Sequence, residues 1–114
     1  MARREKKMIE SVIDPETGLE WQAITPNYTM TWKQAIEYAT KLNLHGWCDW
    51  RIPTKEELIT LYEHVLFPGA SGMYWSSSPC RRHRNRVRCV ARCGSECESV
   101  EAHHYIRCVR GGND

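Results

Sequence analysis

Short runs of apolar and β-branched residues lie on both sides of a turn near the start of the chain. The runs are residues 8–13 and 19–23, and the intervening Asp14-Pro15-Glu16-Thr17-Gly18 contains residues that favour tight turns. This arrangement predicts a β-hairpin at the beginning of the folded region.

The next pattern is helical. Thr31 and Gln34 have the spacing of a capping box, in which the side chain of each residue bonds the backbone amide of the other. Behind them, apolar residues recur every three or four positions as far as about Asn43. We therefore expect a first helix between Thr31 and about Asn43.

A second helix is expected after Pro53. Thr54 and Glu57 form another capping box at its start. The apolar positions at helical spacing are Leu58, Leu61, Tyr62, Val65 and Leu66. This helix should end before Pro68-Gly69, because proline cannot continue a helix.

From residue 73 onward the pattern changes to that of β-strands. Residues 73–78, 86–92 and 105–110 are the strand-like segments. In the middle segment polarity alternates, so Val87 and Cys89 share one face and the arginines lie on the other. These three segments predict strands that follow the helices.

A turn is expected at Cys93-Gly94-Ser95-Glu96, after the middle strand. Symmetric pairing about this turn would bring Val100 and Ala102 to the apolar face. It would also place Glu101 opposite Arg88 as a favourable cross-strand pair.

A hairpin, two helices and several strands indicate an α+β domain. The chain has 114 residues, which suits one core, so we treat residues 8–112 as a single domain and residues 1–7 as a charged tail. The amino terminus runs into no apolar stretch long enough for a signal peptide or a membrane span. We therefore expect a cytoplasmic protein without membrane insertion, and association with a virion or another assembly stays open.

The net charge of +2 hides a strongly basic segment. Residues 80–93 contain six Arg and no acid, whereas Glu96, Glu98 and Glu101 follow shortly after. The segment is therefore either a basic patch or one of two strands that neutralise each other. Its polar side chains are the candidate ligand contacts. They are Arg81, Arg82, His83, Arg84, Asn85, Arg86, Arg88 and Arg92.

Six Cys in a chain of this length leave a metal site, a disulfide and reduced thiols as open interpretations. Cys89, Cys93 and Cys97 are weak metal candidates, because their spacing does not match the paired motif of common zinc sites. If a disulfide forms, Cys93 and Cys97 are the expected pair, since they flank the predicted turn. Cys89 and Cys108 suit buried positions. We assign no cofactor.

Four segments of the chain occur in a specific order and at a specific spacing. They are Asp14-Pro15-Glu16-Thr17-Gly18-Leu19-Glu20-Trp21-Gln22, Gly46-Trp47-Cys48-Asp49-Trp50-Arg51-Ile52-Pro53-Thr54, Tyr74-Trp75-Ser76-Ser77-Ser78 and Ile106-Arg107-Cys108-Val109-Arg110-Gly111-Gly112. Together they resemble the family named for the C-terminal domain of a Legionella collagen-like protein, a domain of unknown function. The resemblance implies a C-type-lectin-like fold, in which the terminal strands pair and two helices flank a small, mostly antiparallel sheet. It also implies that Trp50 lies in the core and that Arg51 makes a structural hydrogen bond.

The chain departs from this family between residues 80 and 105, where it lacks aromatic and Asp-Gly-rich strands. In similar proteins the variable C-terminal segment forms an exposed binding face, and some relatives are targets of diversity-generating retroelements. The resemblance therefore implies that residues 80–105 carry the variable recognition surface.

Catalysis is not indicated by the residue patterns. The serines at 76–78 lack a nucleophile-elbow motif and an evident set of histidine and acid partners. We expect a non-enzymatic ligand-binding module that recognises a protein or surface ligand. One alternative is a nucleic-acid or polyanion binder that uses the same arginines, although the basic segment has no interleaved aromatic residues for base stacking. Another is a disulfide- or metal-stapled structural subunit of an assembly.

Overall fold

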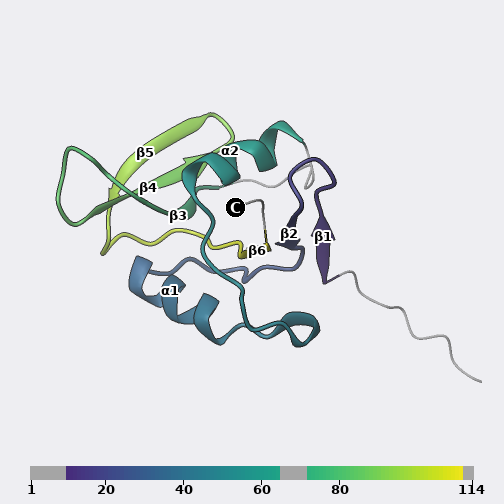
Figure 1. Cartoon of the computed structure of the whole chain (residues 1–114). Helices are drawn as coiled ribbons and strands as arrows, with labels where there is room; N and C mark the ends of the chain where they lie inside the picture. Colours follow the sequence, from purple (N-terminus) through teal and green to yellow (C-terminus); the bar gives the residue numbers. More distant parts are fainter. Residues whose placement is uncertain (1–9, 65–71, 112–114) are drawn as a thin grey trace, which may run out of the picture.

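Two three-stranded antiparallel sheets and two α-helices form the part of the chain that the structure describes, residues 10–64 and 72–111 (Figure 1). The structure is a computed structural model of the whole chain. It confirms the α+β class. The expectation of a single small sheet is wrong, because the strands divide between two sheets. The predicted tail, residues 1–7, lies outside the described residues.

The first sheet joins the two ends of the described chain. It contains β1 (Ser11–Ile13), β2 (Leu19–Gln22) and β6 (Val109–Gly111) in the order β1-β2-β6. Gly18 closes the turn between β1 and β2 with a φ of 76°, a conformation that glycine adopts without steric cost. The predicted hairpin and the pairing of strands from the two ends are therefore both confirmed.

The second sheet contains β3 (Tyr74–Pro79), β4 (Arg86–Ala91) and β5 (Gly94–Ser99) in chain order. Ala91 pairs with Gly94, so the turn consists of the two residues between them, the commonest length of a hairpin loop. The predicted turn at residues 93–96 is wrong because Gly94 already belongs to β5.

This shorter turn changes the register that the sequence suggested. Arg88 lies opposite Cys97, and Arg86 lies opposite Ser99. The predicted pairing of Arg88 with Glu101 is therefore wrong, since Glu101 follows the end of β5 and lies in a turn.

Both helices begin as predicted. α1 (Trp32–Lys41) and α2 (Lys55–Glu63) each have a complete capping box, with Thr31 and Thr54 as the N-cap residues. α1 ends two residues earlier than expected, because Leu42 has an extended backbone conformation. A short 3₁₀ turn (Leu44–Gly46) follows. The C-terminal part of the predicted second helix, including Val65 and Leu66, lies outside the described residues.

α1 covers one face of the second sheet. Trp75 of β3 and Cys89 of β4 are direct cross-strand neighbours on this face, and they belong to the same buried cluster as Ala35 and Ala39 of α1. The Trp75 indole donates a hydrogen bond to the Met30 carbonyl over 2.7 Å. The polar atom of this buried tryptophan is therefore satisfied.

α2 covers part of the opposite face. Val90 and Tyr74 are cross-strand neighbours there, and both belong to a second buried cluster with Leu58 of α2. By strand alternation Val90 shares this face with Arg86 and Arg88. The face is thus apolar where α2 packs on it and basic beyond the helix.

Candidate functional site

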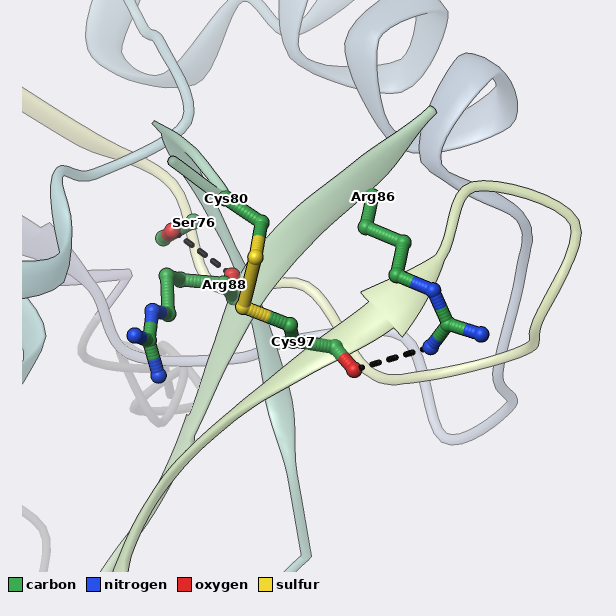
Figure 2. Close-up of a disulfide and its surroundings, with 5 residues drawn as sticks. All are labelled: Ser76, Cys80, Arg86, Arg88 and Cys97. Carbon is green, nitrogen blue, oxygen red and sulfur yellow. Dashed lines mark hydrogen bonds between the residues drawn. A yellow bond between two sulfur atoms is a disulfide. The ribbon is translucent and has the colours of Figure 1, made fainter. Parts of the chain in front are cut away.

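A disulfide fixes the basic end of the second sheet. Cys80, which directly follows β3, is bonded to Cys97 in the middle of β5, with their Cα atoms 5.7 Å apart (Figure 2). Because Cys97 lies opposite Arg88, the disulfide is on the face of the sheet that carries the arginines. The bond ties the residue that directly precedes the β3–β4 loop to β5.

The predicted disulfide between Cys93 and Cys97 is wrong. Cys93 is free and exposed in the turn before β5. Residues four positions apart along a strand are separated by about 13 Å, whereas a disulfide needs Cα atoms within about 7 Å. Cys80 can reach Cys97 because the chain brings it alongside from another strand.

The arginine loop, residues 81–85, connects β3 to β4. All five of its side chains are exposed. Backbone hydrogen bonds hold its ends, because the Cys80 amide donates to the Arg86 carbonyl and the Val100 amide donates to the Asn85 carbonyl. Asn85 has a φ of 62°, and asparagine is one of the few residues other than glycine that tolerate this region. The loop is therefore anchored while its cations face solvent.

Arg86 and Arg88 continue the basic surface along β4. Figure 2 shows their side chains on the two sides of the Cys80–Cys97 disulfide. The Arg86 guanidinium donates to the Cys97 carbonyl over 3.3 Å, and the Arg88 carbonyl accepts a 2.7 Å hydrogen bond from Ser76. The structure thus brings these two predicted residues next to the arginine loop.

Arg92 lies apart from the other candidates. It is in the turn at the far end of the β4–β5 hairpin, where its guanidinium carbon is 5.9 Å from the centre of the Tyr62 ring. Both side chains line a separate cavity of about 570 Å³ between α2 and this turn. Arg92 therefore does not share a site with the arginine loop.

The acidic residues of β5 do not neutralise the arginines of β4. Glu96 lies opposite Cys89 and Glu98 lies opposite Val87, so both acids project from the other face of the sheet. Glu98 is paired there with His104, with 2.8 Å between carboxylate oxygen and imidazole nitrogen. Of the two interpretations of the basic segment, the structure favours a patch.

A cavity of about 480 Å³ opens beside the arginine loop. The candidates that line it are Arg81, Arg82 and Arg88. Residues that the sequence did not indicate complete the lining. They are Lys55 and Glu56 of α2 and Ser78 and Pro79 of β3. No local signal could have identified them, because they reach the cavity only through the packing of α2 against the sheet.

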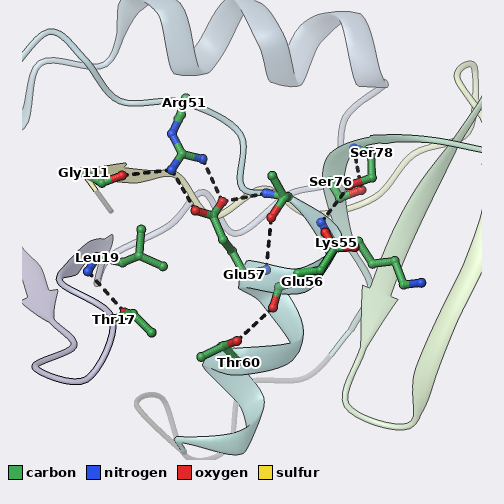
Figure 3. Close-up of polar contacts among 11 residues, drawn as sticks. Thr17, Leu19, Arg51, Lys55, Glu56, Glu57, Thr60, Ser76, Ser78 and Gly111 are labelled. Atoms are coloured by element: carbon green, nitrogen blue, oxygen red, sulfur yellow. Dashed lines mark hydrogen bonds and ion pairs between the residues drawn. The ribbon is translucent and has the colours of Figure 1, made fainter. Parts of the chain in front are cut away.

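The start of α2 is held in place by polar contacts on both sides (Figure 3). On one side, the Arg51 guanidinium binds both carboxylate oxygens of Glu57 at 2.7 and 2.8 Å and donates to the Gly111 carbonyl. On the other, the Lys55 amide donates to the Ser78 hydroxyl over 3.0 Å. The structural role expected for Arg51 is confirmed, and it helps to position one wall of the cavity.

Trp50 and Trp47, three positions apart, differ sharply in burial. Trp50 is only 4% exposed, and its indole donates to the Leu44 carbonyl, which confirms the expectation that it lies in the core. Trp47 is 49% exposed, with the Arg110 guanidinium carbon 4.0 Å from its ring centre. Both serve to join elements of the fold rather than to line the basic cavity.

The weak metal candidates do not meet. Cys89 is buried, Cys93 is exposed, and Cys97 is bonded to Cys80 in the disulfide. In the described ranges, His, Cys, Asp and Glu side chains form no group of three or more that could hold a metal ion. Burial raises the pKa of the Cys108 thiol to about 12 and also raises that of Cys89. Both thiols therefore stay protonated, as expected for cysteines that fill the core.

These features define a small α+β domain with a disulfide-anchored, arginine-rich surface. The family model of the Lcl C-terminal domain matches residues 10–110, and the chain belongs to this family. No curated protein matches the sequence. In the described part of the chain, no helix combines the length and apolar character that a membrane span requires.

Proposed function

We infer that this chain is a non-enzymatic binding module with a C-type-lectin-like fold, whose arginine surface recognises a protein or a surface-exposed ligand. The observation that carries the proposal is the separation of charge across the second sheet. The arginines of the loop and of β4 lie together, whereas Glu96 and Glu98 project from the opposite face. A cationic surface that its neighbours leave unneutralised attracts partners of the opposite charge.

The way the surface is built also supports recognition. Rigid elements that hold an exposed loop are the usual design of binding sites. Here the Cys80–Cys97 disulfide and the backbone hydrogen bonds of Cys80 and Val100 fix the loop from both sides. A loop fixed in this way loses less conformational entropy when a partner binds.

A non-enzymatic role agrees with the location of the ionic side chains whose pKa values are shifted. Perturbed acids and bases tend to gather in catalytic sites. In the described residues, the ionic groups with shifted pKa values form pairs that tie elements together, such as Arg51 with Glu57 and Arg110 with Asp49. They lie outside the lining of the arginine cavity.

The family relation extends the proposal to sequence variation. The segment proposed to be diversified by a retroelement, residues 80–105, includes the arginine loop, β4 and β5. Deep sequencing of the gene across its source population tests this extension. Substitutions concentrated in residues 80–105 over residues 8–79 would support it, and a uniform distribution would contradict it.

Peptide selection tests the binding function itself. A random-peptide phage library is panned on the immobilised protein, and enriched clones are measured on two variants that each remove two positive charges. Arg81→Ser/Arg82→Ser should abolish binding, whereas Lys33→Ser/Lys41→Ser on exposed positions of α1 should preserve it. A lack of enriched clones, or equal losses in both variants, would contradict the proposed function.

A polyanion binder is the second candidate, because unneutralised arginines also suit phosphates. Salt dependence separates the two candidates. Contacts to several phosphates make affinity fall steeply as salt rises, whereas a protein interface with apolar contacts responds less.

A further inference from the structure

The cavity beside the arginine loop collects positive charge from three parts of the chain. Lys55 comes from α2, Arg81 and Arg82 come from the loop, and Arg88 comes from β4. Among the described residues that line the cavity, Glu56 is the single acid. This cavity is smaller and more specific than the basic surface as a whole, because most of the exposed arginine loop does not line it.

A continuous series of hydrogen bonds links the cavity walls. The Lys55 amide donates to the Ser78 hydroxyl, and the Ser78 amide donates to the Ser76 hydroxyl. The Ser76 hydroxyl in turn donates to the Arg88 carbonyl. The first residue of α2 is therefore tied through β3 to β4, as Figures 2 and 3 show for its two halves.

The disulfide holds the remaining wall. Cys80 directly precedes Arg81, and its partner Cys97 lies opposite Arg88. The backbone positions that carry the cations are thus fixed before any ligand arrives. A pre-organised cluster of cations gains affinity because little ordering is left to occur on binding.

The chemistry of the lining favours carboxylates. A guanidinium group offers parallel donors that match the two oxygens of a carboxylate, and such charge-assisted pairs are stronger than neutral hydrogen bonds. Among the described residues that line the cavity none is aromatic, so the cavity offers no surface on which a nucleic-acid base could stack. A cavity of about 480 Å³ also has room for side chains of a partner.

We propose that this cavity receives the carboxylate side chains of an acidic segment of a partner protein. This inference rests on the proposed binding function and names the chemistry of the ligand. The carboxylates contact Lys55, Arg81, Arg82 and Arg88. The exposed Arg84 lies outside the cavity and contributes only to the overall positive electrostatic potential.

Titration with defined peptides tests the inference. The probe is a capped hexaglutamate peptide, with hexaglutamine as its uncharged counterpart, and binding is followed by calorimetry and by amide NMR shifts. Hexaglutamate should bind and hexaglutamine should not. Lys55→Ser and Arg88→Ser should each weaken binding about tenfold, the effect of losing one charge-assisted hydrogen bond.

Arg84→Ser is the matched control, because it also removes one positive charge, from a position in the arginine loop that does not line the cavity. It should change affinity less than about twofold, as expected for an exposed charge that is screened by salt. Equal losses in the Arg84, Lys55 and Arg88 variants would overturn the cavity as the site. Melting curves of each variant establish that it is folded, and Arg88→Lys gives a second variant that retains the charge but loses the paired donors.

Two further probes separate the ligand classes. Inorganic phosphate and a single-stranded oligothymidylate are titrated under the same conditions. Tighter binding of the oligonucleotide than of hexaglutamate would overturn the carboxylate assignment in favour of a nucleic acid. Enriched phage peptides that lack acidic residues would overturn this inference alone, whereas an absence of any enriched peptide would count against the proposed function as well.

Discussion

Cys80 and Cys97 are 17 positions apart in the chain, yet their disulfide joins the end of β3 to the middle of β5. Because β4 lies between these strands in the second sheet, the bond crosses over β4 on the arginine face. It therefore determines how the arginine loop is held, and it connects the stability of the domain to the geometry of the proposed site.

Removal of this disulfide should destabilise the domain. The Cys80→Ser/Cys97→Ser variant should lose about 3 kcal/mol of unfolding free energy, because closing a loop of this length restricts the unfolded chain. Urea unfolding monitored by circular dichroism measures the loss. Cys93→Ser is the control and should stay within about 0.5 kcal/mol of the parent protein. A larger effect for Cys93→Ser would contradict the Cys80–Cys97 pairing.

Trp75 and Trp47 should respond very differently to truncation. Trp75 is fully buried and bonds the Met30 carbonyl, so Trp75→Ala should cost about 3–5 kcal/mol. Trp47 is half exposed and stacks on Arg110, so Trp47→Ala should cost about 1 kcal/mol or less. Chemical denaturation followed by circular dichroism gives both values, and similar losses would argue against the described packing of β3.

Glu57 combines two roles at the start of α2. Its carboxylate accepts from the Thr54 amide in the capping box and binds the Arg51 guanidinium. Glu57→Ala should therefore lower the unfolding free energy by about 1–2 kcal/mol, and Glu57→Gln should lose less because an amide can still accept the capping bond. Thermal melts compare these variants with Glu63→Gln, an exposed position at the end of α2. Equal stability of the two Glu57 variants would show that the capping hydrogen bond contributes nothing, and equal stability of Glu57→Gln and the parent protein would show the same of the charge.

His64 should make stability depend on pH. A hydrogen bond to Asp14 raises the pKa of His64 above its ordinary 6.5, with smaller contributions from nearby acids. Burial raises the pKa of Asp14, but hydrogen bonds from His64 and from the Glu16 amide outweigh this effect and leave it below its ordinary 3.8. The contribution of His64 is thus full below about pH 6.5 and is lost as pH rises through its higher folded-state pKa. That of Asp14 is lost only as pH falls through its lowered pKa.

Urea midpoints measured from pH 5.5 to 8.5 test this pH dependence. The parent protein should lose stability across the upper part of this range, and His64→Gln should flatten the profile. Because His64→Gln leaves every other titratable group in place, the difference between the two curves isolates His64. Parallel curves would contradict the Asp14–His64 interaction.

Chelator should leave the melting temperature unchanged. The weak metal candidates Cys89, Cys93 and Cys97 are dispersed, and the described residues form no other group suited to a metal. A melt with and without EDTA checks this expectation. A drop in melting temperature on chelation would mean that a metal ion stabilises the domain.

Much of the local structure could be predicted from short patterns. The two capping boxes act over four residues, and the turn before Gly18 acts over five, so their chemistry is contained in the sequence itself. The basic character of residues 80–93 could also be read directly from the sequence, whereas the choice between an exposed patch and two strands that neutralise each other could not. In contrast, the β4–β5 turn lies earlier in the chain than the predicted residues 93–96. Several turn residues occur there in succession, and no local signal shows which pair closes the hairpin.

The sequence by itself therefore determined the α+β class, the helix starts, the N-terminal hairpin and the identity of the basic segment, since these depend on neighbouring residues. Only the tertiary structure decided that Cys80 bonds Cys97, that the acids of β5 face away from the arginines, and that Lys55 and Ser78 join the cavity. The physical reason is that α2 and β3 are brought together by burial of Leu58, Tyr74 and Val90. That packing is a property of the whole chain, and no local pattern contains it.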